Sequence, residues 1–306
     1  MNIIGEDSFG GIYADIKANK LIVNIKDPSL ENSTLLDPYR DLLLFNIVNK
    51  SLNELKVQFD QDVRDANVSE SYIYIYLEVN NVILHPNSPP DLNTQPFGPR
   101  KHASMRPRQQ RIRTRVLAGE GVFIRDKEIK YQYIRKVCSL SFFACSRKRA
   151  PMHSPTNYII TARSCNLKDS KLSNDLYLRN WGIVNLSSRE LRSLGYPELF
   201  ITDARPATIH SGYICHAGFG THVTSGNIKA LTAFYLNKEN SSSEGLIITD
   251  MNTRIEDIGG TIFFYKSQDL RYVDLCGIQV TSGPNIAAVL PSNIILEHAD
   301  LILHKL

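Results

Sequence analysis

The stretch RIEDIGGTIFFY, Arg254 to Tyr265, places two acidic residues, a Gly-Gly pair and an apolar run in direct succession. Glycine adopts backbone conformations that other residues avoid, so a Gly-Gly pair at this place predicts a tight turn. The run TIFFY is rich in β-branched and aromatic residues, which predicts a buried strand. Taken alone, the stretch is typical of a turn that leads into a core strand.

The neighbouring sequence has the same character. From about Leu117 onward, short apolar runs alternate with turn-forming residues, and no long helical periodicity occurs before PSNIILEHADLIL, Pro291 to Leu303. This pattern predicts a β-sandwich or β-barrel with a terminal helix. The runs are GVFI, SLSFF, NYIITA, WGIVNL, NIKALTAFYL, GLIIT, TIFFY and DLCGIQV.

The first 85 residues predict a separate α+β domain. Residues 10–25 form a strand-turn-strand pattern with the turn at 18–19, and residues 71–84 repeat it with the turn at 80–81. Between these two hairpins, residues 51–65 carry apolar side chains at helical spacing, and an Asp-Pro pair at 37–38 could open an earlier short helix.

Residues 86–117 are rich in Pro, Asn, Ser and Arg and predict an extended linker. The chain is therefore divided into residues 1–85, the linker 86–117, and a β domain over 118–306. The linker carries seven basic residues and no acidic residue between Arg100 and Arg115, so the net charge of +4 belongs to this segment and not to a folded surface.

The basic segment has three interpretations. It could bind phosphates of nucleic acid, it could be cleaved at the Arg-x-x-Arg pattern of residues 108–111, or it could be an inert solvated linker. No aromatic residue stands between the arginines, which disfavours base stacking. We therefore expect an inert or processed linker, not a nucleic-acid site.

Composition sets further limits. A length of 306 residues with 42% hydrophobic residues suits about two globular domains, and no run reaches the roughly 20 apolar residues of a membrane span. The first residues lack the basic and apolar regions of a signal peptide. Three histidines lie close in sequence without helical metal-ligand spacing, so we expect ordinary histidines and neither a metal nor a cofactor; they are His210, His216 and His222.

In this order, the runs resemble the bacterial-type serine proteases of the chymotrypsin fold, the streptogrisin and α-lytic protease group. VCSLSFFA, YIITARSC, RNWGIVNL, FGTHVTSGNIKALTAFY, EDIGGTIFFY and VLPSNIILEHADLIL each look like a motif of that family. GIYADIKANKLIVNI looks like its folding pro-region. The resemblance implies a mainly β fold: a chymotrypsin-like double six-stranded β-barrel with a C-terminal helix, preceded by a small α+β pro-region-like domain.

The family's catalytic positions can be transferred one at a time. Its general-base histidine falls on Ser164, its orienting aspartate on Asn180 and its nucleophilic serine on Ile258. Serine and asparagine do not act as general bases at neutral pH, and isoleucine has no nucleophilic atom. The resemblance therefore implies a degenerate triad and no protease activity.

The nucleophile loop is altered as well. The first glycine of the oxyanion hole falls on Glu256, which places a carboxylate where negative charge must be stabilised. Asp257 matches the family's structural aspartate, and Gly259 and Gly260 match its glycines. The arginine that pairs with this aspartate in the bacterial enzymes falls in YICHAG, where the sequence has none, so the partner of Asp257 is unexplained.

The cysteines are only partly explained. Cys138 and Cys165 match the family's disulfide that flanks the histidine loop. The family's cysteine before the nucleophile falls on Asn252. We expect buried free thiols at the remaining three cysteines, Cys145, Cys215 and Cys276.

These observations predict an extracellular, catalytically inactive homologue that binds a protein or an extended peptide in the former substrate cleft. Its N-terminal domain should dock on the barrel domain through the strand at about residues 79–84. The alternative is an active serine endopeptidase with a different triad, for which Asp175, His153 and Ser187 are the candidates. A third interpretation is nucleic-acid binding by residues 100–115.

Overall fold

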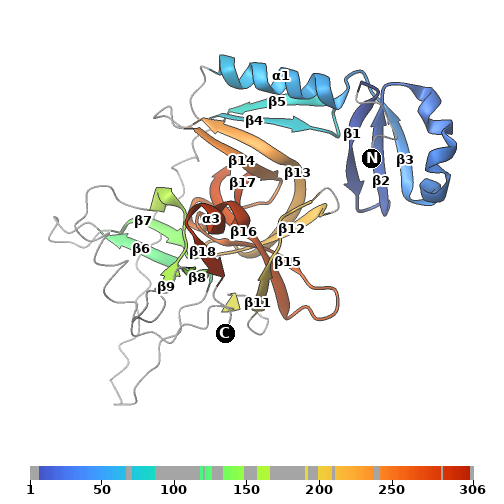
Figure 1. Ribbon diagram of the computed structural model, residues 1–306. Helices are drawn as coiled ribbons and strands as arrows, with labels where there is room; N and C mark the ends of the chain where they lie inside the picture. Colours follow the sequence, from blue (N-terminus) through green and yellow to red (C-terminus); the bar gives the residue numbers. More distant parts are fainter. Residues whose placement is uncertain are drawn as a thin grey trace, which may run out of the picture.

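The fold is mainly β, as predicted, and its several sheets are consistent with a chymotrypsin-like β fold (Figure 1). A computed structural model describes these parts of the chain: residues 7–66, 71–86, 118–119, 121–125, 134–147, 157–165, 190–191, 199–208, 211–236, 242–283 and 285–303. No helix among them is long and apolar enough to cross a membrane.

Six consecutive strands close into one antiparallel barrel. β12, β13 and β14 pair in chain order, β14 pairs with β17, β17 with β16, β16 with β15, and β15 returns to β12. One apolar cluster takes a side chain from every strand of this ring. The strands are β12 (Tyr213–Gly218), β13 (His222–Leu236), β14 (Ser242–Thr249), β15 (Thr261–Tyr265), β16 (Tyr272–Gly283) and β17 (Ile286–Pro291).

A second group of strands packs beside this barrel. β6 (Gly121–Arg125) pairs with β7 (Ile134–Ser139), and β8 (Phe143–Ser146) pairs with β9 (Asn157–Ile159), which leads to the short 3-10 helix η3 (Arg163–Cys165). Buried side chains of this group, such as Phe142, join the core formed by β15 and β16. On the barrel, β11 (Leu199–Ala204) pairs in parallel with β16, and β10 (Glu190–Leu191) pairs with β11.

The C-terminal helix is shorter than predicted. α3 covers only Ser292–His298, and β18 (Leu301–Leu303) then pairs with β8. Asp300 adopts a positive φ of 52°, which ends the helical path. Leu301 and Leu303 are buried on either side of exposed Ile302, the alternation of a strand. The helical interpretation of Pro291 to Leu303 was therefore wrong for its last residues.

The N-terminal sheet confirms the first predicted hairpin. β1 (Phe9–Asp15) pairs with β2 (Lys20–Ile25), and Asn19 adopts the positive φ of 51° that the turn requires. A third strand, β3 (Leu43–Ile47), pairs in parallel with β2 and was not predicted. Two 3-10 helices connect β2 and β3: η1 (Pro28–Asn32) and η2 (Thr34–Leu42), the latter containing the predicted Asp-Pro pair.

The predicted helix and second hairpin are confirmed. α1 (Leu52–Asp65) begins with a capping box, in which Ser51 and Glu54 exchange side-chain and backbone hydrogen bonds. β4 (Ser71–Tyr76) and β5 (Asn81–Pro86) form the hairpin. Figure 1 shows α1 lying along this hairpin, and its buried Leu55 packs with apolar side chains of β4, β5 and β13.

This hairpin joins the barrel sheet, through β4 and not through the predicted strand at residues 79–84. Residues 71–74 of β4 pair antiparallel with residues 233–236 of β13. Each of these four β4 residues is buried, as in a central strand, whereas β5 alternates and keeps Leu84 exposed. The long buried run SYIYIY is therefore the part of the hairpin suited to lie between two other strands.

Tyr72 anchors the contact between the β4–β5 hairpin and the barrel. Its side chain is fully buried, and its ring stacks on Tyr235 of β13 at a centroid distance of 4.8 Å. Its hydroxyl hydrogen-bonds to Thr281 of β16. Nearby, Lys229 of β13 lies 3.7 Å from the carboxylate of Glu78 in the hairpin turn. The β4–β5 hairpin thus contributes both backbone pairing and core side chains to the barrel.

Candidate functional site

Ile258, the position that the resemblance assigns to the nucleophile, directly follows the closed 3-10 turn η5 (Ile255–Asp257), just before β15. The backbone N–H of Asp257 donates to the Arg254 carbonyl at 3.0 Å, and the N–H of Ile258 donates to the Ile255 carbonyl at 3.3 Å. An oxyanion hole requires N–H groups that are aimed at the substrate oxygen. Here the N–H of Ile258 already donates to the Ile255 carbonyl, so it is not aimed at a substrate oxygen.

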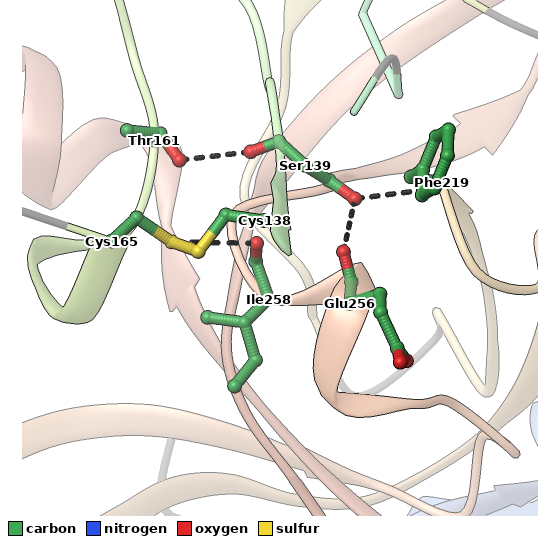
Figure 2. The surroundings of a disulfide bond; sticks show 7 residues. All are labelled: Cys138, Ser139, Thr161, Cys165, Phe219, Glu256 and Ile258. Atoms are coloured by element: carbon green, nitrogen blue, oxygen red, sulfur yellow. Dashed lines mark hydrogen bonds between the residues drawn. A yellow bond between two sulfur atoms is a disulfide. The ribbon is translucent and has the colours of Figure 1, made fainter. Parts of the chain in front are cut away.

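The side chain of Ile258 packs against a disulfide. Cys138 and Cys165 are bonded, with their Cα atoms 6.0 Å apart, which confirms the pairing that the resemblance implied. Ile258 is only 9% exposed and forms a small apolar cluster with both cysteines and Ala162. Figure 2 shows the isoleucine beside the disulfide, with the Cys165 Sγ 3.6 Å from the Ile258 carbonyl oxygen.

Ser139 holds the turn from β7, and sequence reasoning missed it. Its hydroxyl donates to the Glu256 carbonyl at 2.8 Å and accepts from the Phe219 N–H at 2.8 Å (Figure 2). Its backbone N–H donates to the Ile258 carbonyl at 2.8 Å. A buried hydroxyl with both a donor and an acceptor partner fixes a specific arrangement. Ser139 therefore ties the turn to both β7 and the loop after β12.

The two glycines of the turn are required by close contacts. Gly259 has a φ of 93°, and a Cβ there would lie 2.3 Å from both the Ser139 carbonyl oxygen and the Thr161 hydroxyl. A Cβ on Gly260 would lie 2.4 Å from the His216 ring. Their backbones bind Gln279 of β16, with the Gly259 N–H donating at 2.8 Å and the Gly260 carbonyl accepting at 3.0 Å.

Asp257 is held by four hydrogen-bond donors without an arginine. Its carboxylate is fully buried and accepts from the Gly220 N–H at 2.6 Å, the Thr221 N–H at 2.9 Å and the Thr221 hydroxyl at 2.8 Å. It also accepts from the Arg254 N–H at 2.8 Å. Backbone N–H groups stabilise a buried carboxylate well. The carboxylate therefore connects the turn to the 220–221 loop.

In the stretch YICHAG, where an arginine was expected beside Asp257, the structure places a histidine. His216 of β12 is fully buried close to Asp257. Nothing in the sequence except its place in that stretch pointed to this contact. Burial lowers the pKa of His216, while the nearby Asp257 acts to raise it. Because the net direction is downward, we expect the ring to be neutral at neutral pH.

The structure brings some of the transferred positions together. Ser164 lies exposed in η3, directly before Cys165, whose sulfur contacts Ile258. Asn180 lies outside the described residues. So do His210 and the alternative triad candidates His153, Asp175 and Ser187. Within the described parts, no group of three His, Cys, Asp or Glu side chains could hold a metal ion.

An edge of β16 begins beside the turn. β16 pairs with β15 only as far as Ile278, whereas its pairing with β17 continues to Gly283. From Val280 to Gly283, β16 therefore has a barrel partner on one side only, within the described residues. This segment follows directly after Gln279, which binds both glycines of the turn. An edge strand of this kind can accept an extended peptide.

Comparison with known proteins finds a likeness among solved structures, whereas no family model and no curated protein sequence matches the chain. Thermobifida fusca protease A is 13% identical, with a TM-score of 0.45 over 63% of this chain and 100% of that chain. Nocardiopsis protease is 14% identical, with a TM-score of 0.46 over the same shares. Cellulomonas bogoriensis chymotrypsin is 15% identical with a TM-score of 0.41, again over 63% and 100%. At these values the likeness assigns neither an activity nor a binding partner.

Proposed function

We propose that the protein is a catalytically inactive homologue of the chymotrypsin-fold serine proteases that acts by binding a protein or an extended peptide. One observation supports the proposal. At Ile258, the residue that the resemblance assigns to the nucleophile's position, the side chain packs on the Cys138–Cys165 disulfide and the N–H donates within the turn.

Acyl transfer needs a nucleophile, a base and donors for the oxyanion, and all three are affected here. The hydrocarbon of Ile258 has no lone pair to attack a carbonyl carbon. Ser164 offers a hydroxyl where a proton acceptor is required. The closed turn places the Ile255 carbonyl, a negative dipole end, on the N–H that would otherwise face the substrate oxygen.

The segment Val280–Gly283 supports peptide binding at the same place. It follows Gln279, which is bonded to the turn, and it has one barrel partner within the described residues. Main-chain pairing with such an edge gives affinity without any catalytic group. Tyr72 reaches Thr281 in this segment, so the N-terminal domain borders the proposed binding surface.

We also propose that the protein works in an oxidising compartment outside the cytoplasm. The Cys138–Cys165 disulfide supports this location, because structural disulfides persist mainly in secreted or extracellular proteins. Mass mapping of protein purified from its native source without reducing agent would test it. A free thiol at both cysteines in that material would contradict the proposal.

Peptide-display selection on the intact chain tests the binding function. We expect enriched peptides whose binding is lost when alternate backbone N–H groups are methylated, because N-methylation removes the donors of a paired strand. Ile258→Arg places a long charged side chain beside the edge and should abolish binding. Leu270→Arg, at a position that is 64% exposed in the β15–β16 connection, controls for the added charge and should bind normally. Because Ile258 is buried, an intact unfolding transition of Ile258→Arg is the control for loss of the fold.

Two outcomes would overturn the proposal. Enriched peptides that tolerate methylation at every position, or that bind Ile258→Arg as well as the unmodified chain, would place the binding surface elsewhere. Cleavage of the selected peptides by the unmodified protein would instead support the active-endopeptidase alternative, since binding alone breaks no bond.

A further inference from the structure

The His216 ring is buried, and neither of its nitrogens makes a hydrogen bond of good geometry among the described residues. The Asp257 backbone carbonyl lies close enough to act on the ring and favour its protonated form, but this carbonyl already accepts from the Gly260 N–H at 2.8 Å. A buried polar atom without a partner destabilises the folded state. Such a group calls for an explanation in terms of strain or function.

Two glycines leave the space that the ring fills. A Cβ on Gly260 would lie 2.4 Å from His216 Nε2. A Cβ on Gly218 would lie 2.4 Å from His216 Cε1 and 2.6 Å from the Asp257 carboxylate. The imidazole and the carboxylate therefore share one small space bounded by β12 and the turn. Little room remains there for the water that a charged ring would attract.

The elements around the ring offer few charged groups. β15 presents Ile262 opposite His216, and β13 presents Thr224. On the turn, Asp257 acts on the histidine, and its neighbours Arg254 and Glu256 are exposed and half-buried, respectively. The other titratable groups nearby are His222 of β13, opposite Gly218, and the buried thiol of Cys215 on β12 itself.

We propose that His216 is a proton-operated lock on the turn of residues 254–260, closed when the ring is neutral and released when it is protonated. The neutral ring fits its dry space. An imidazolium there needs water or a free acceptor, whereas the Asp257 carboxylate already accepts from four donors and the Asp257 carbonyl from the Gly260 N–H. Moving the turn away from β12 supplies both water and access to the carboxylate.

The direction of the pH dependence follows from the histidine. Burial lowers the pKa of His216 from its ordinary value of 6.5. The stabilisation by the neutral ring is therefore complete above that value and declines as the pH falls below it. The closed turn takes up a proton only on opening, so opening becomes more favourable in acid. The inference concerns the turn itself and does not depend on the proposed peptide binding.

Hydrogen exchange on the intact chain, corrected for the intrinsic pH dependence of exchange, tests the lock. Between about pH 7.5 and about pH 5, we expect opening of residues 254–260 to increase by about tenfold per unit over the lower part of the range, as uptake of one proton requires. Residues 273–278 of β16 and 286–290 of β17 should remain protected. His298→Gln, which removes an exposed histidine on α3, should behave like the unmodified chain.

His216→Gln supplies the decisive comparison, because an amide does not titrate in this range. Its turn should show no pH dependence of opening, whereas an unchanged pH dependence would overturn the proposal. If this variant does not fold, the ring signals of His216 in the unmodified chain can be followed by NMR. The chemical shifts of the His216 ring and of the Ile258 amide must change with the same pH midpoint. Different midpoints, or no change in the His216 shifts before the protein unfolds in acid, would equally overturn the proposal.

Discussion

The backbone N–H of Ile258 donates to the carbonyl of Ile255 at 3.3 Å, so the turn that leads into β15 is closed on itself. The Asp257 carboxylate and the Ser139 hydroxyl hold this turn from two sides. The turn before β15 is therefore closed by its own backbone and fixed by side chains from outside it. Each of the contacts below can be tested separately.

Asp257→Asn should destabilise the folded protein strongly. The amide nitrogen would face N–H donors of residues 220–221 that now bind a carboxylate oxygen, and each buried donor left without an acceptor costs about 1–3 kcal/mol. Urea denaturation at neutral pH would measure the loss. Asp269→Asn, in an exposed ion pair with Arg271, is the matched control and should change the midpoint little. Equal midpoints for the two variants would contradict the structural role of Asp257.

The disulfide should contribute substantially to stability. Its cysteines are 27 residues apart, and the chain-entropy model gives about 3–4 kcal/mol for a loop of this length. Replacing both cysteines by serine should lower the free energy of unfolding by roughly this amount. Reducing agent should destabilise the unmodified chain and leave the double variant unaffected. Mass mapping that pairs Cys138 with Cys145 would contradict the assignment.

Removal of the Tyr72 ring should weaken the packing of the β4–β5 hairpin on the barrel and lower the free energy of unfolding. The ring is fully buried and stacked on Tyr235, and truncation of a large buried aromatic side chain costs about 3–5 kcal/mol. Tyr72→Ala should show this loss in thermal or urea unfolding. Tyr213→Ala, at a position that is 51% exposed on β12, should unfold like the unmodified chain.

The same contact predicts assistance in folding. The barrel joins strands that are distant in sequence, and such non-local pairings form slowly. Residues 116–306 alone should therefore refold with a higher yield when residues 1–85 are added in trans. A Tyr72→Ala version of residues 1–85 should help less. Equal refolding yields in all three experiments would count against a foldase role.

The three free thiols should be unreactive in the folded protein. Cys145, Cys215 and Cys276 are buried, and burial raises the pKa of Cys276 to about 12. Since the thiolate is the reactive form, a thiol reagent at about pH 8 should modify none of them. Denaturation without reduction should expose all three. Rapid modification of the native chain would show that one of them is accessible.

The elements that could be predicted from the sequence are those whose apolar side chains recur with the spacing of a strand or a helix. Both predicted hairpins and the helix α1 formed because their apolar spacing matches a strand or a helix. β18 was missed because ILEHADLIL has apolar spacing that suits a helix as well, and the positive φ of Asp300 is not visible in it. β3 was missed because its neighbours, and not its own pattern, place it in a sheet.

The candidate site was predictable only in part. Cys138, Cys165 and Ile258 could be located from the order of the motifs, and the disulfide was confirmed. The hydrogen bond that closes the turn could not be predicted, because it depends on the orientation of one peptide group. The contacts of Ser139 and His216 join residues far apart in the chain, and no local pattern encodes them.

Restoring one catalytic group should not restore activity. Ile258→Ser alone would create a hydroxyl without a base beside it, in a turn whose N–H is still engaged, and triad members act as a unit. Only the combination Ser164→His, Asn180→Asp, Glu256→Gly and Ile258→Ser supplies every required group. We expect the single variant to remain inert towards a fluorophosphonate, which reacts only with an activated serine.

The most direct measurement is fluorophosphonate labelling of the unmodified, folded protein, with an active serine protease as the positive control and heat-denatured protein as the background. We expect folded and denatured samples to give the same background signal, because isoleucine stands at the position that the resemblance assigns to the nucleophilic serine. Stoichiometric labelling of any serine in the folded protein, lost after heat denaturation, would contradict it and show an active endopeptidase.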